Sequence, residues 1–223
     1  MGILIGAMAL VLVPPARAAD PATPAGAARR LVILGDSITA GYGLEPEQAY
    51  PALLQARIVA AGHAVTVVNA GVSGDTTAGG RRRVAWALGK ERADALLIAL
   101  GGNDGLRGVP PDQTRENLKE IIRLARAKKP DIHIVLAGMQ MPDNVGADYQ
   151  QAFAATFPQV AASERVQLLP FLLESVGGVA ELNLDDRVHP NQAGQRRICE
   201  TVWTALQPWL LGTNPAAQPT STE

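Results

Sequence analysis

The sequence predicts an α/β fold, a three-layer sandwich in which helices cover both faces of a mostly parallel, five-stranded sheet. Two observations lead to this prediction. Short apolar segments alternate along the chain with longer segments of helical character. The apolar segments are also continuous rather than alternating with polar residues, as in Ala-Leu-Leu-Ile-Ala-Leu at 95–100. A continuous apolar strand has to be covered on both faces, which crossover helices do in a parallel sheet.

Each expected element follows from this alternation. The strands are the apolar runs rich in Leu, Val and Ile, at residues 31–35, 65–69, 95–100, 132–137 and 166–169. The helices are the longer segments that separate or follow them, at residues 50–61, 77–90, 112–127, 149–162 and 192–210. A parallel connection needs a crossover of about a dozen or more residues, so a helix between each pair of successive strands favours a parallel sheet.

We expect one folded domain at residues 29–211. The chain has 223 residues, within reach of a single domain, and 47% of them are apolar, which argues against a disordered protein. Residues 20–28 are rich in Pro, Ala and Gly, and residues 212–223 in Thr, Pro, Ala and Ser. We expect an unstructured leader and an unstructured tail there.

The first 19 residues have the pattern of a cleavable signal peptide. Residues 3–13 form an apolar run too short to span a bilayer as a permanent helix, and Ala16-Arg17-Ala18 is a small-x-small cleavage pattern. No Lys or Arg precedes the apolar run, and no cysteine directly follows it for lipid attachment. We therefore expect an exported, periplasmic protein without a stable membrane anchor.

Composition argues against several classes of function. The formal net charge of −1 gives no reason to expect a nucleic acid as partner, and the basic residues 81–83 predict a solvated helix face. Cys199 is the only cysteine, so it cannot form an internal disulfide and is expected in the core. His63, His133 and His189 are scattered without metal-ligand spacing, and we expect no metal and no cofactor.

Three loops of small and polar residues fall at the carboxyl ends of expected strands, where ligands bind in sheets of this kind. They are Gly-Asp-Ser at 35–37, Gly-Val-Ser-Gly at 71–74 and Gly-Gly-Asn-Asp at 101–104. Each loop on its own is ordinary turn chemistry. Because the expected architecture brings the three loops together at one edge of the sheet, their convergence indicates a site.

Ser37 is the candidate nucleophile of that site. A serine hydroxyl reacts poorly until a base takes its proton, and the base works best when a third group orients it. Asp-Arg-Val-His at 186–189 supplies a carboxylate and an imidazole three residues apart, just before the last helix. The spacing favours Asp186 over its neighbour Asp185 as the orienting acid. Together these residues indicate acyl transfer to water.

Four blocks of the sequence resemble those of the SGNH (GDSL-type) hydrolases, in the same order. They are Gly-Asp-Ser-Ile-Thr-Ala-Gly-Tyr-Gly at 35–43, Asn-Ala-Gly-Val-Ser-Gly-Asp-Thr-Thr at 69–77, Gly-Gly-Asn-Asp-Gly-Leu-Arg-Gly at 101–108 and Asp-Arg-Val-His-Pro-Asn at 186–191. The resemblance covers residues 31–210 and is to the branch of periplasmic multifunctional esterases, acyl-CoA thioesterases and lysophospholipases (arylesterases). It implies a flavodoxin-like α/β/α sandwich, the SGNH hydrolase fold.

The resemblance also implies the roles of individual residues. Ser37, His189 and Asp186 would form the catalytic triad of a serine esterase that works through an acyl-enzyme intermediate. The oxyanion hole would consist of the backbone amides of Ser37 and Gly74 and the side-chain amide of Asn103. A glycine at 74 lets the backbone approach the substrate closely, and an asparagine donates hydrogen bonds without carrying a charge.

The expected substrates are small-molecule or lipid carboxylic esters. Aryl and short-to-medium acyl esters come first, thioesters and lysophospholipids are further candidates, and we expect a monomer. We expect Tyr42, Leu106, Met141 and Val145 to line the acyl site, where Met adapts to irregular shapes. The family often has an aromatic residue where Val145 stands, so the acyl-chain preference stays open. Two alternatives remain: a carbohydrate or peptidoglycan O-acetylesterase, and a flavodoxin-like binding module or inactive relative.

Overall fold

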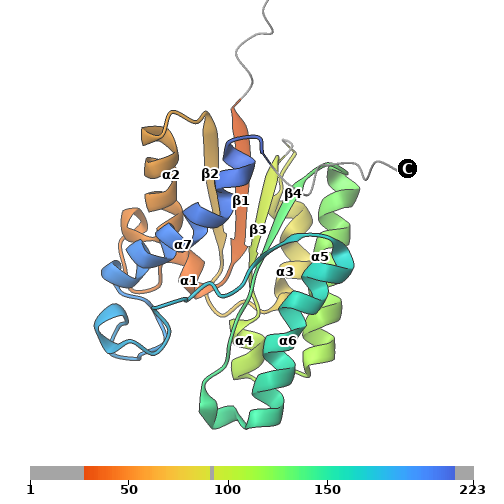
Figure 1. Ribbon diagram of the computed structural model, residues 1–223, viewed down its shortest axis with the longest axis vertical. Coiled ribbons are helices and arrows are strands. Elements are labelled where there is room, and N and C mark those ends of the chain that lie inside the picture. The colour runs from red at the N-terminus through yellow and green to blue at the C-terminus, as the bar shows by residue number, and fades with distance from the viewer. Residues whose placement is uncertain (1–27, 91–92, 214–223) are drawn as a thin grey trace, which may run out of the picture.

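A computed structural model describes residues 28–90 and 93–213. Its centre is a five-stranded sheet with the spatial order β2-β1-β3-β4-β5, in which every neighbouring pair of strands is parallel (Figure 1). The strands are β1 (Arg29–Gly35), β2 (Val65–Gly71), β3 (Ala95–Ala99), β4 (His133–Ala137) and β5 (Gln167–Leu169). This sheet confirms the predicted α/β class, and each strand lies within two residues of its expected bounds.

Helices cover both faces of the sheet (Figure 1). Two of them pack against each other on one face, and three form the layer on the other face. The first pair is α2 (Tyr50–Ala60) and α7 (Gln192–Leu210), and the second layer is α3 (Thr77–Ala87), α5 (Pro111–Lys128) and α6 (Ala147–Glu164). All five correspond to expected helices. The expected end of the second helix at residue 90 is wrong, because Gly89 has φ +70 and takes the chain out of α3.

Two short helices appear where the sequence predicts loops. They are α1 (Ser37–Ala40), which follows β1, and α4 (Gly102–Leu106), which follows β3. Single turns of 3-10 helix lie in three further connections, as η1 (Pro46–Gln48), η2 (Asp143–Val145) and η3 (Ala180–Leu182). Both short α-helices therefore begin at the edge of the sheet where the candidate site was expected.

The sheet forms the centre of the hydrophobic core. Residues 31–34 of β1 and 95–99 of β3 are fully buried between the two helical layers. These strands lie in the middle of the sheet, which explains why their sequences are continuously apolar. Cys199 of α7 is buried in the same core, as expected.

Gln195 of α7 forms hydrogen bonds with two residues near the start of the domain. Its side-chain oxygen accepts the backbone N–H of Tyr50 at 2.8 Å, and its side-chain nitrogen donates to the carbonyl of Ile38 at 3.0 Å. The Tyr50 hydroxyl forms a further hydrogen bond of 2.9 Å with the hydroxyl of Thr39. All these groups are buried. The C-terminal helix is thereby fastened to the helical turn that begins at Ser37.

The strand order reverses beside β1. The chain passes from β1 outward to β2 and then returns across β1 to β3, so the carboxyl ends of these three strands lie side by side (Figure 1). Ligands bind at such a switch point in open α/β sheets. The three loops identified in the sequence all start there.

The expected signal peptide at 1–19 lies outside the described residues, as do residues 20–27 of the expected leader and 214–223 of the expected tail. Within residues 28–90 and 93–213, no helix combines the length and the apolar character needed to span a membrane.

Candidate active site

Ser37 is the first residue of α1 and lies just beyond the end of β1. Asp36 caps this helix, because its Oδ1 accepts the backbone N–H of Ile38 at 3.0 Å. The turn is tight: a Cβ on Gly35 would lie 1.9 Å from the hydroxyl oxygen of Thr39. A glycine at the strand end therefore allows the chain to fold directly from β1 into α1, which places Ser37 at the carboxyl edge of the sheet.

His189 and Asp186 lie on the loop between η3 and α7. Asp186 Oδ1 accepts the backbone N–H groups of both Val188 and His189 at 2.9 Å, and Arg187 completes the turn with φ +57. An Asp side chain that bonds the backbone two residues further on is a common way to build a turn. The local sequence therefore places the Asp186 carboxylate beside His189.

The three side chains form a hydrogen-bonded chain. Asp186 Oδ2 lies 2.6 Å from His189 Nδ1, and His189 Nε2 lies 3.0 Å from Ser37 Oγ, although Ser37 and His189 are 152 positions apart. When Nδ1–H donates to the carboxylate, Nε2 keeps its lone pair toward the hydroxyl. The backbone N–H of His189, and then its ring, lower the pKa of Asp186 to about 2. The Asp186 carboxylate is thus charged throughout the neutral range.

Tyr42 covers one side of the three hydrogen-bonded side chains. Its ring centroid lies 4.3 Å from that of His189, with the two ring planes inclined by 36°. Tyr42 follows Gly41, which ends α1 with φ +80 and turns the chain back over the site. About half of the Tyr42 side chain remains exposed, so its ring is available at the surface beside His189.

Gly74 and Asn103 come from the loops after β2 and β3. The N–H of Asp75 donates to the carbonyl of Val72 at 3.1 Å, and Gly74 between them has φ +77, as the third residue of a type II turn requires. Asn103 Nδ2 donates to the carbonyl of Asp75 at 2.9 Å and lies 3.4 Å from Asp36 Oδ2. The Asn103 amide therefore lies between the loops that carry Ser37 and Gly74.

The next residue, Asp104, fixes α4 against α3. Asp104 is buried; its Oδ2 accepts the backbone N–H of Thr77 at 2.8 Å, and its Oδ1 accepts the Thr77 hydroxyl at 2.5 Å. Asn117 of α5 donates to the same Thr77 hydroxyl at 3.2 Å. The side chain of Asp104 thus orders the loops on which Asn103 and Gly74 lie, and it has no contact with Ser37.

The sequence matches the GDSL-like Lipase/Acylhydrolase family over residues 33–197. The chain belongs to this family. It is 43% identical to Esterase TesA of Pseudomonas aeruginosa over 208 residues, which cover 93% of this chain and 98% of the relative. It is 39% identical to Thioesterase 1/protease 1/lysophospholipase L1 of Escherichia coli K12 over 184 residues, 82% of this chain and 86% of the relative. The crystal structure of the esterase EstA from Pseudoalteromonas sp., 31% identical, has a TM-score of 0.77 and covers 82% of this chain and 99% of that one.

These matches confirm the resemblance to the GDSL-type hydrolases. They also agree with the sheet order and with the helical layers on its two faces. The family assignment makes the chain a hydrolase, and the geometry of Ser37, His189 and Asp186 shows where this hydrolase brings its chemical groups together.

Asp36 is a buried carboxyl group next to Ser37 in this GDSL-type hydrolase. Burial raises the pKa of Asp36 to about 6, against the opposing effects of the Ile38 N–H and of His189. The folded protein therefore binds a proton at Asp36 more tightly than the unfolded chain, whose ordinary value is 3.8. As the pH rises from about 4 to about 6, Asp36 ionises in the unfolded chain before it ionises in the folded protein, so the free energy of unfolding falls. Above that range the loss stays constant.

Asp36→Asn should for this reason gain stability relative to wild type as the pH rises. Asn keeps an oxygen for the Ile38 N–H and cannot ionise, so the difference in free energy of unfolding should shift by about 2–3 kcal/mol in favour of the variant between about pH 4 and pH 7. Urea unfolding at a series of pH values measures this difference. Asp131→Asn, at an exposed position, is the control and should show no such shift. If the difference in free energy of unfolding between Asp36→Asn and wild type did not depend on pH, the raised pKa of Asp36 would be contradicted.

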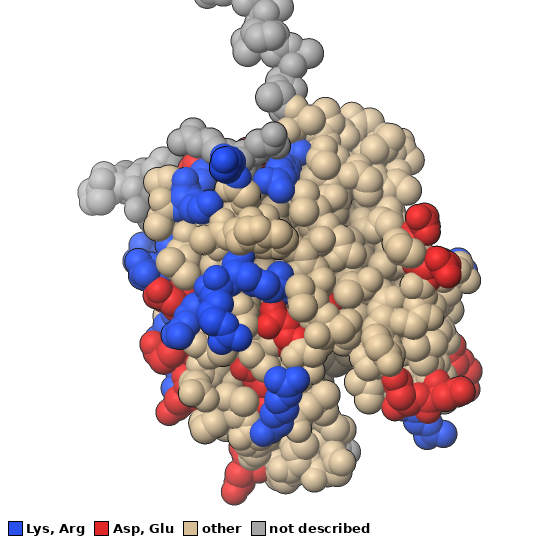
Figure 2. Space-filling model, turned by 180° about the vertical axis from the view of Figure 1, so that it is seen from behind, with Lys and Arg blue, Asp and Glu red and all other residues tan. Residues whose placement is uncertain are grey.

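The sequence pattern at residues 81–83 predicts a solvated helix face, and for Arg83 this is wrong. Arg81 and Arg82 are exposed, and Figure 2, which shows the molecule from the side of α3, has basic side chains gathered near the middle of that face. Arg83 turns inward instead, beneath the ends of β1 and β2, and forms an ion pair with Asp75. A single arginine in this helix therefore belongs to the surroundings of the site.

The four residues expected to line the acyl site lie in different environments. Tyr42 and Leu106 are exposed, whereas Val145 is partly buried against the core. Met141 is buried, and its sulfur would lie 2.2 Å from a Cβ placed on Gly105. Met141 therefore fills the space beneath α4 that Gly105 leaves open, and it presents little surface of its own.

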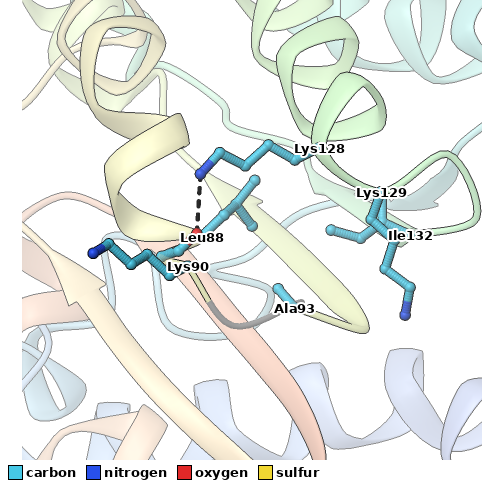
Figure 3. A pocket seen from close by; sticks show the side chains of 7 residues that line it. Leu88, Lys90, Ala93, Lys128, Lys129 and Ile132 are labelled. Carbon is cyan, nitrogen blue, oxygen red and sulfur yellow. Dashed lines mark hydrogen bonds between the residues drawn. The ribbon is translucent and has the colours of Figure 1, made fainter.

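A separate cavity of about 220 Å³ lies at the opposite edge of the sheet (Figure 3). Its lining residues include Ala93 and Ile132, which lie two residues before β3 and one residue before β4, whereas Ser37 follows the carboxyl end of β1. Lys128 reaches across it to the carbonyl of Gly89 at 2.9 Å. Ser37, His189 and Asp186 are not among the residues that line it. In the described part of the chain, no group of three or more His, Cys, Asp or Glu side chains is arranged to hold a metal ion.

Proposed function

We propose that this GDSL-type hydrolase is a serine esterase that cleaves carboxylic esters through an acyl-enzyme intermediate. The observation that carries the proposal is the chain of hydrogen bonds from Asp186 through His189 to Ser37, with distances of 2.6 Å and 3.0 Å. This is the arrangement that activates a serine hydroxyl as a nucleophile. The names of the relatives, esterase, arylesterase and thioesterase/lysophospholipase, support the same reaction.

In the first step, Ser37 Oγ attacks the acyl carbon while its proton passes to His189 Nε2. Asp186 stabilises the imidazolium that forms. The proposed donors to the developing oxyanion are the backbone N–H groups of Ser37 and Gly74 and the side-chain Nδ2–H of Asn103. When the tetrahedral intermediate collapses, the alcohol or phenol leaves with the proton that His189 returns to it.

In the second step, water takes the place of the alcohol. His189 Nε2 accepts a proton from the water molecule as its oxygen attacks the acyl carbon on Ser37. The second tetrahedral intermediate uses the same oxyanion donors as the first. Its collapse releases the carboxylic acid, and His189 returns the proton to Ser37 Oγ, which restores the free enzyme.

The proposed substrates are small-molecule or lipid esters, with aryl and short-to-medium acyl esters first and thioesters and lysophospholipids next. Tyr42, which lies against His189, and Leu106, which ends the helix of Asn103, offer exposed apolar surface for the acyl or aryl group. Val145 and the buried Met141 are proposed to support that surface from the core side. Met is unbranched and accommodates irregular shapes, which suits a broad acyl preference.

We further propose that residues 1–19 direct export to the periplasm and that the mature protein is a monomer. The apolar run at 3–13 and the Ala16-Arg17-Ala18 pattern support the first proposal. N-terminal sequencing of the exported protein should then find a start directly after residue 18 or 19.

A fluorophosphonate probe tests the esterase proposal, because it reacts with an activated serine to leave a stable phosphonylated enzyme. We expect wild-type protein to be labelled at Ser37 and to release nitrophenol from nitrophenyl esters, and Ser37→Ala to do neither. Ser163→Ala, which removes an exposed hydroxyl of α6, is the matched control and should behave as wild type. No labelling of wild type, or labelling that persists in Ser37→Ala, would contradict the proposal. Activity confined to acetyl esters in a series of acyl lengths would favour the O-acetylesterase alternative.

A further inference from the structure

We propose that Arg83 is a positioning residue for the oxyanion hole, because it connects the loops that carry all three proposed donors. This inference rests on the esterase function proposed above. The Arg83 side chain is 17% exposed, and each guanidinium nitrogen donates to a different acceptor. Nε donates to Asp75 Oδ2 at 2.6 Å, Nη1 to the carbonyl of Ala70 at 2.7 Å and Nη2 to the carbonyl of Gly35 at 2.8 Å.

Two of these acceptors lie at the ends of neighbouring strands. Gly35 is the last residue of β1, two positions before Ser37, and Ala70 is the next-to-last residue of β2. The loop that leaves β2 carries Gly74. Arg83 therefore joins the segment that holds the Ser37 amide to the segment that holds the Gly74 amide, at a place where the ladder between the two strands ends.

The third acceptor, Asp75, provides the connection to the remaining donor. Asp75 closes the turn that contains Gly74, its Oδ1 accepts the N–H of Thr76 at 3.0 Å, and its carbonyl accepts Nδ2–H of Asn103 at 2.9 Å. The Asp75 side chain is 11% exposed, so its ion pair with Arg83 is shielded from water and stronger than a surface pair. A displacement of Asp75 would therefore move the amides of Gly74 and Asn103 together.

Gly79 shows that α3 is built around the Asp75 carboxylate. A Cβ on Gly79 would lie 1.6 Å from Asp75 Oδ1, so any side chain at this position has to displace the carboxylate. Gly79 lies inside the helix and has no positive φ that would require glycine. Because glycine lowers helix stability relative to alanine, the reason for Gly79 is the space that it leaves for Asp75.

The guanidinium group is suited to this role by its shape. Its nitrogens donate in a rigid, planar fork, whereas a lysine ammonium is a compact charge on a flexible stem and does not reproduce that fork. Without a cation at position 83, the Asp75 carboxylate is left shielded from water without its partner. Donors to an oxyanion act mainly in the transition state, so their displacement should lower kcat and leave KM nearly unchanged.

The first experiment compares Arg83→Met and Arg83→Lys with Arg82→Met, which removes an exposed arginine from the same helix. The end point of fluorophosphonate labelling counts the folded active sites, so that kcat is expressed per competent enzyme. We expect kcat to fall about 10²-fold in Arg83→Met and about tenfold in Arg83→Lys, with KM within about threefold of wild type. Arg82→Met should keep the kcat of wild type.

A second set of variants separates positioning from folding. Gly79→Ala keeps Arg83 but displaces the Asp75 carboxylate, so a purely structural role for this cluster predicts a lower Tm with an unchanged kcat per labelled site. The positioning role predicts a lower kcat in the same variant. In the double variant Arg83→Met/Asn103→Ala, the fold-loss of kcat should be smaller than the product of the two single fold-losses, because both changes act on one oxyanion hole.

The proposal is overturned if Arg83→Met keeps kcat within about threefold of wild type, or if its loss appears in KM alone. If Arg83→Met does not fold, Arg83→Lys and Gly79→Ala decide the question by the same criteria. Failure of the esterase proposal itself is recognised separately, because wild-type protein would then show no labelling at Ser37.

Discussion

His189→Ala should lower kcat for nitrophenyl esters by about 10⁵–10⁶-fold and leave KM nearly unchanged. The reason is the 3.0 Å contact between His189 Nε2 and Ser37 Oγ, through which the hydroxyl loses its proton in the proposed mechanism. Without the imidazole, Ser37 remains a neutral alcohol, and only the oxyanion donors and substrate binding still accelerate the reaction. Steady-state hydrolysis at neutral pH, with long incubations for the variant, measures the loss.

His63→Ala is the control for this variant. His63 lies beyond the end of α2, with its ring 6.5 Å from that of Trp203, and has no contact with the triad. Its kcat should equal that of wild type. If His189→Ala kept a kcat within about 100-fold of wild type, another group would have to accept the Ser37 proton.

Asp186→Asn should lower kcat by about 10⁴-fold. Asn retains an oxygen for the backbone N–H groups of Val188 and His189, so the loop is kept and the change isolates the negative charge. The amide group of Asn can also hold the ring in the tautomer that carries the proton on Nε2, which then cannot accept a proton from Ser37. The loss should be constant across the neutral range, because the wild-type carboxylate, with its pKa of about 2, is charged throughout it.

Asp185→Asn is the matched control, since Asp185 is the adjacent acid and is exposed. In the structure, Asp186 and not Asp185 forms the hydrogen bond with His189 Nδ1. The variant Asp185→Asn should therefore keep nearly all of the wild-type turnover. Equal losses in the two variants would mean that the charge of the loop matters rather than the contact with the ring, and this would remove Asp186 from the triad.

The sequence predicts the central strands β1, β3 and β4 well because residues 31–34, 95–99 and 134–137 are continuous apolar runs that only burial between two layers explains. It also predicts where polar loops meet, because the carboxyl ends of parallel strands share one edge. The relation between Asp186 and His189 is visible in the sequence for a local reason, the turn that an Asp side chain forms with the backbone just after it.

The features that the sequence does not predict depend on long-range packing. Nothing in the sequence around Arg83 distinguishes it from a solvated arginine. Only the docking of α3 under β1 and β2 gives it three acceptors. The available signal was Gly79, an unexplained glycine inside a helical pattern, which indicates that another group approaches closely. Met141 is buried for a similar reason, because the missing side chain of Gly105 opens a space beneath α4.

The order of Ser37, Asp186 and His189 along the sequence has a consequence for the newly made polypeptide. Ser37 emerges from the ribosome 152 residues before His189, and α7, whose Gln195 bonds the turn that begins at Ser37, is made later still. A growing chain therefore carries a harmless alcohol until synthesis is almost complete. In the proposed mechanism the base reaches Ser37 only when the segment that carries His189 has docked, so a molecule that ends before His189 lacks the group that activates Ser37.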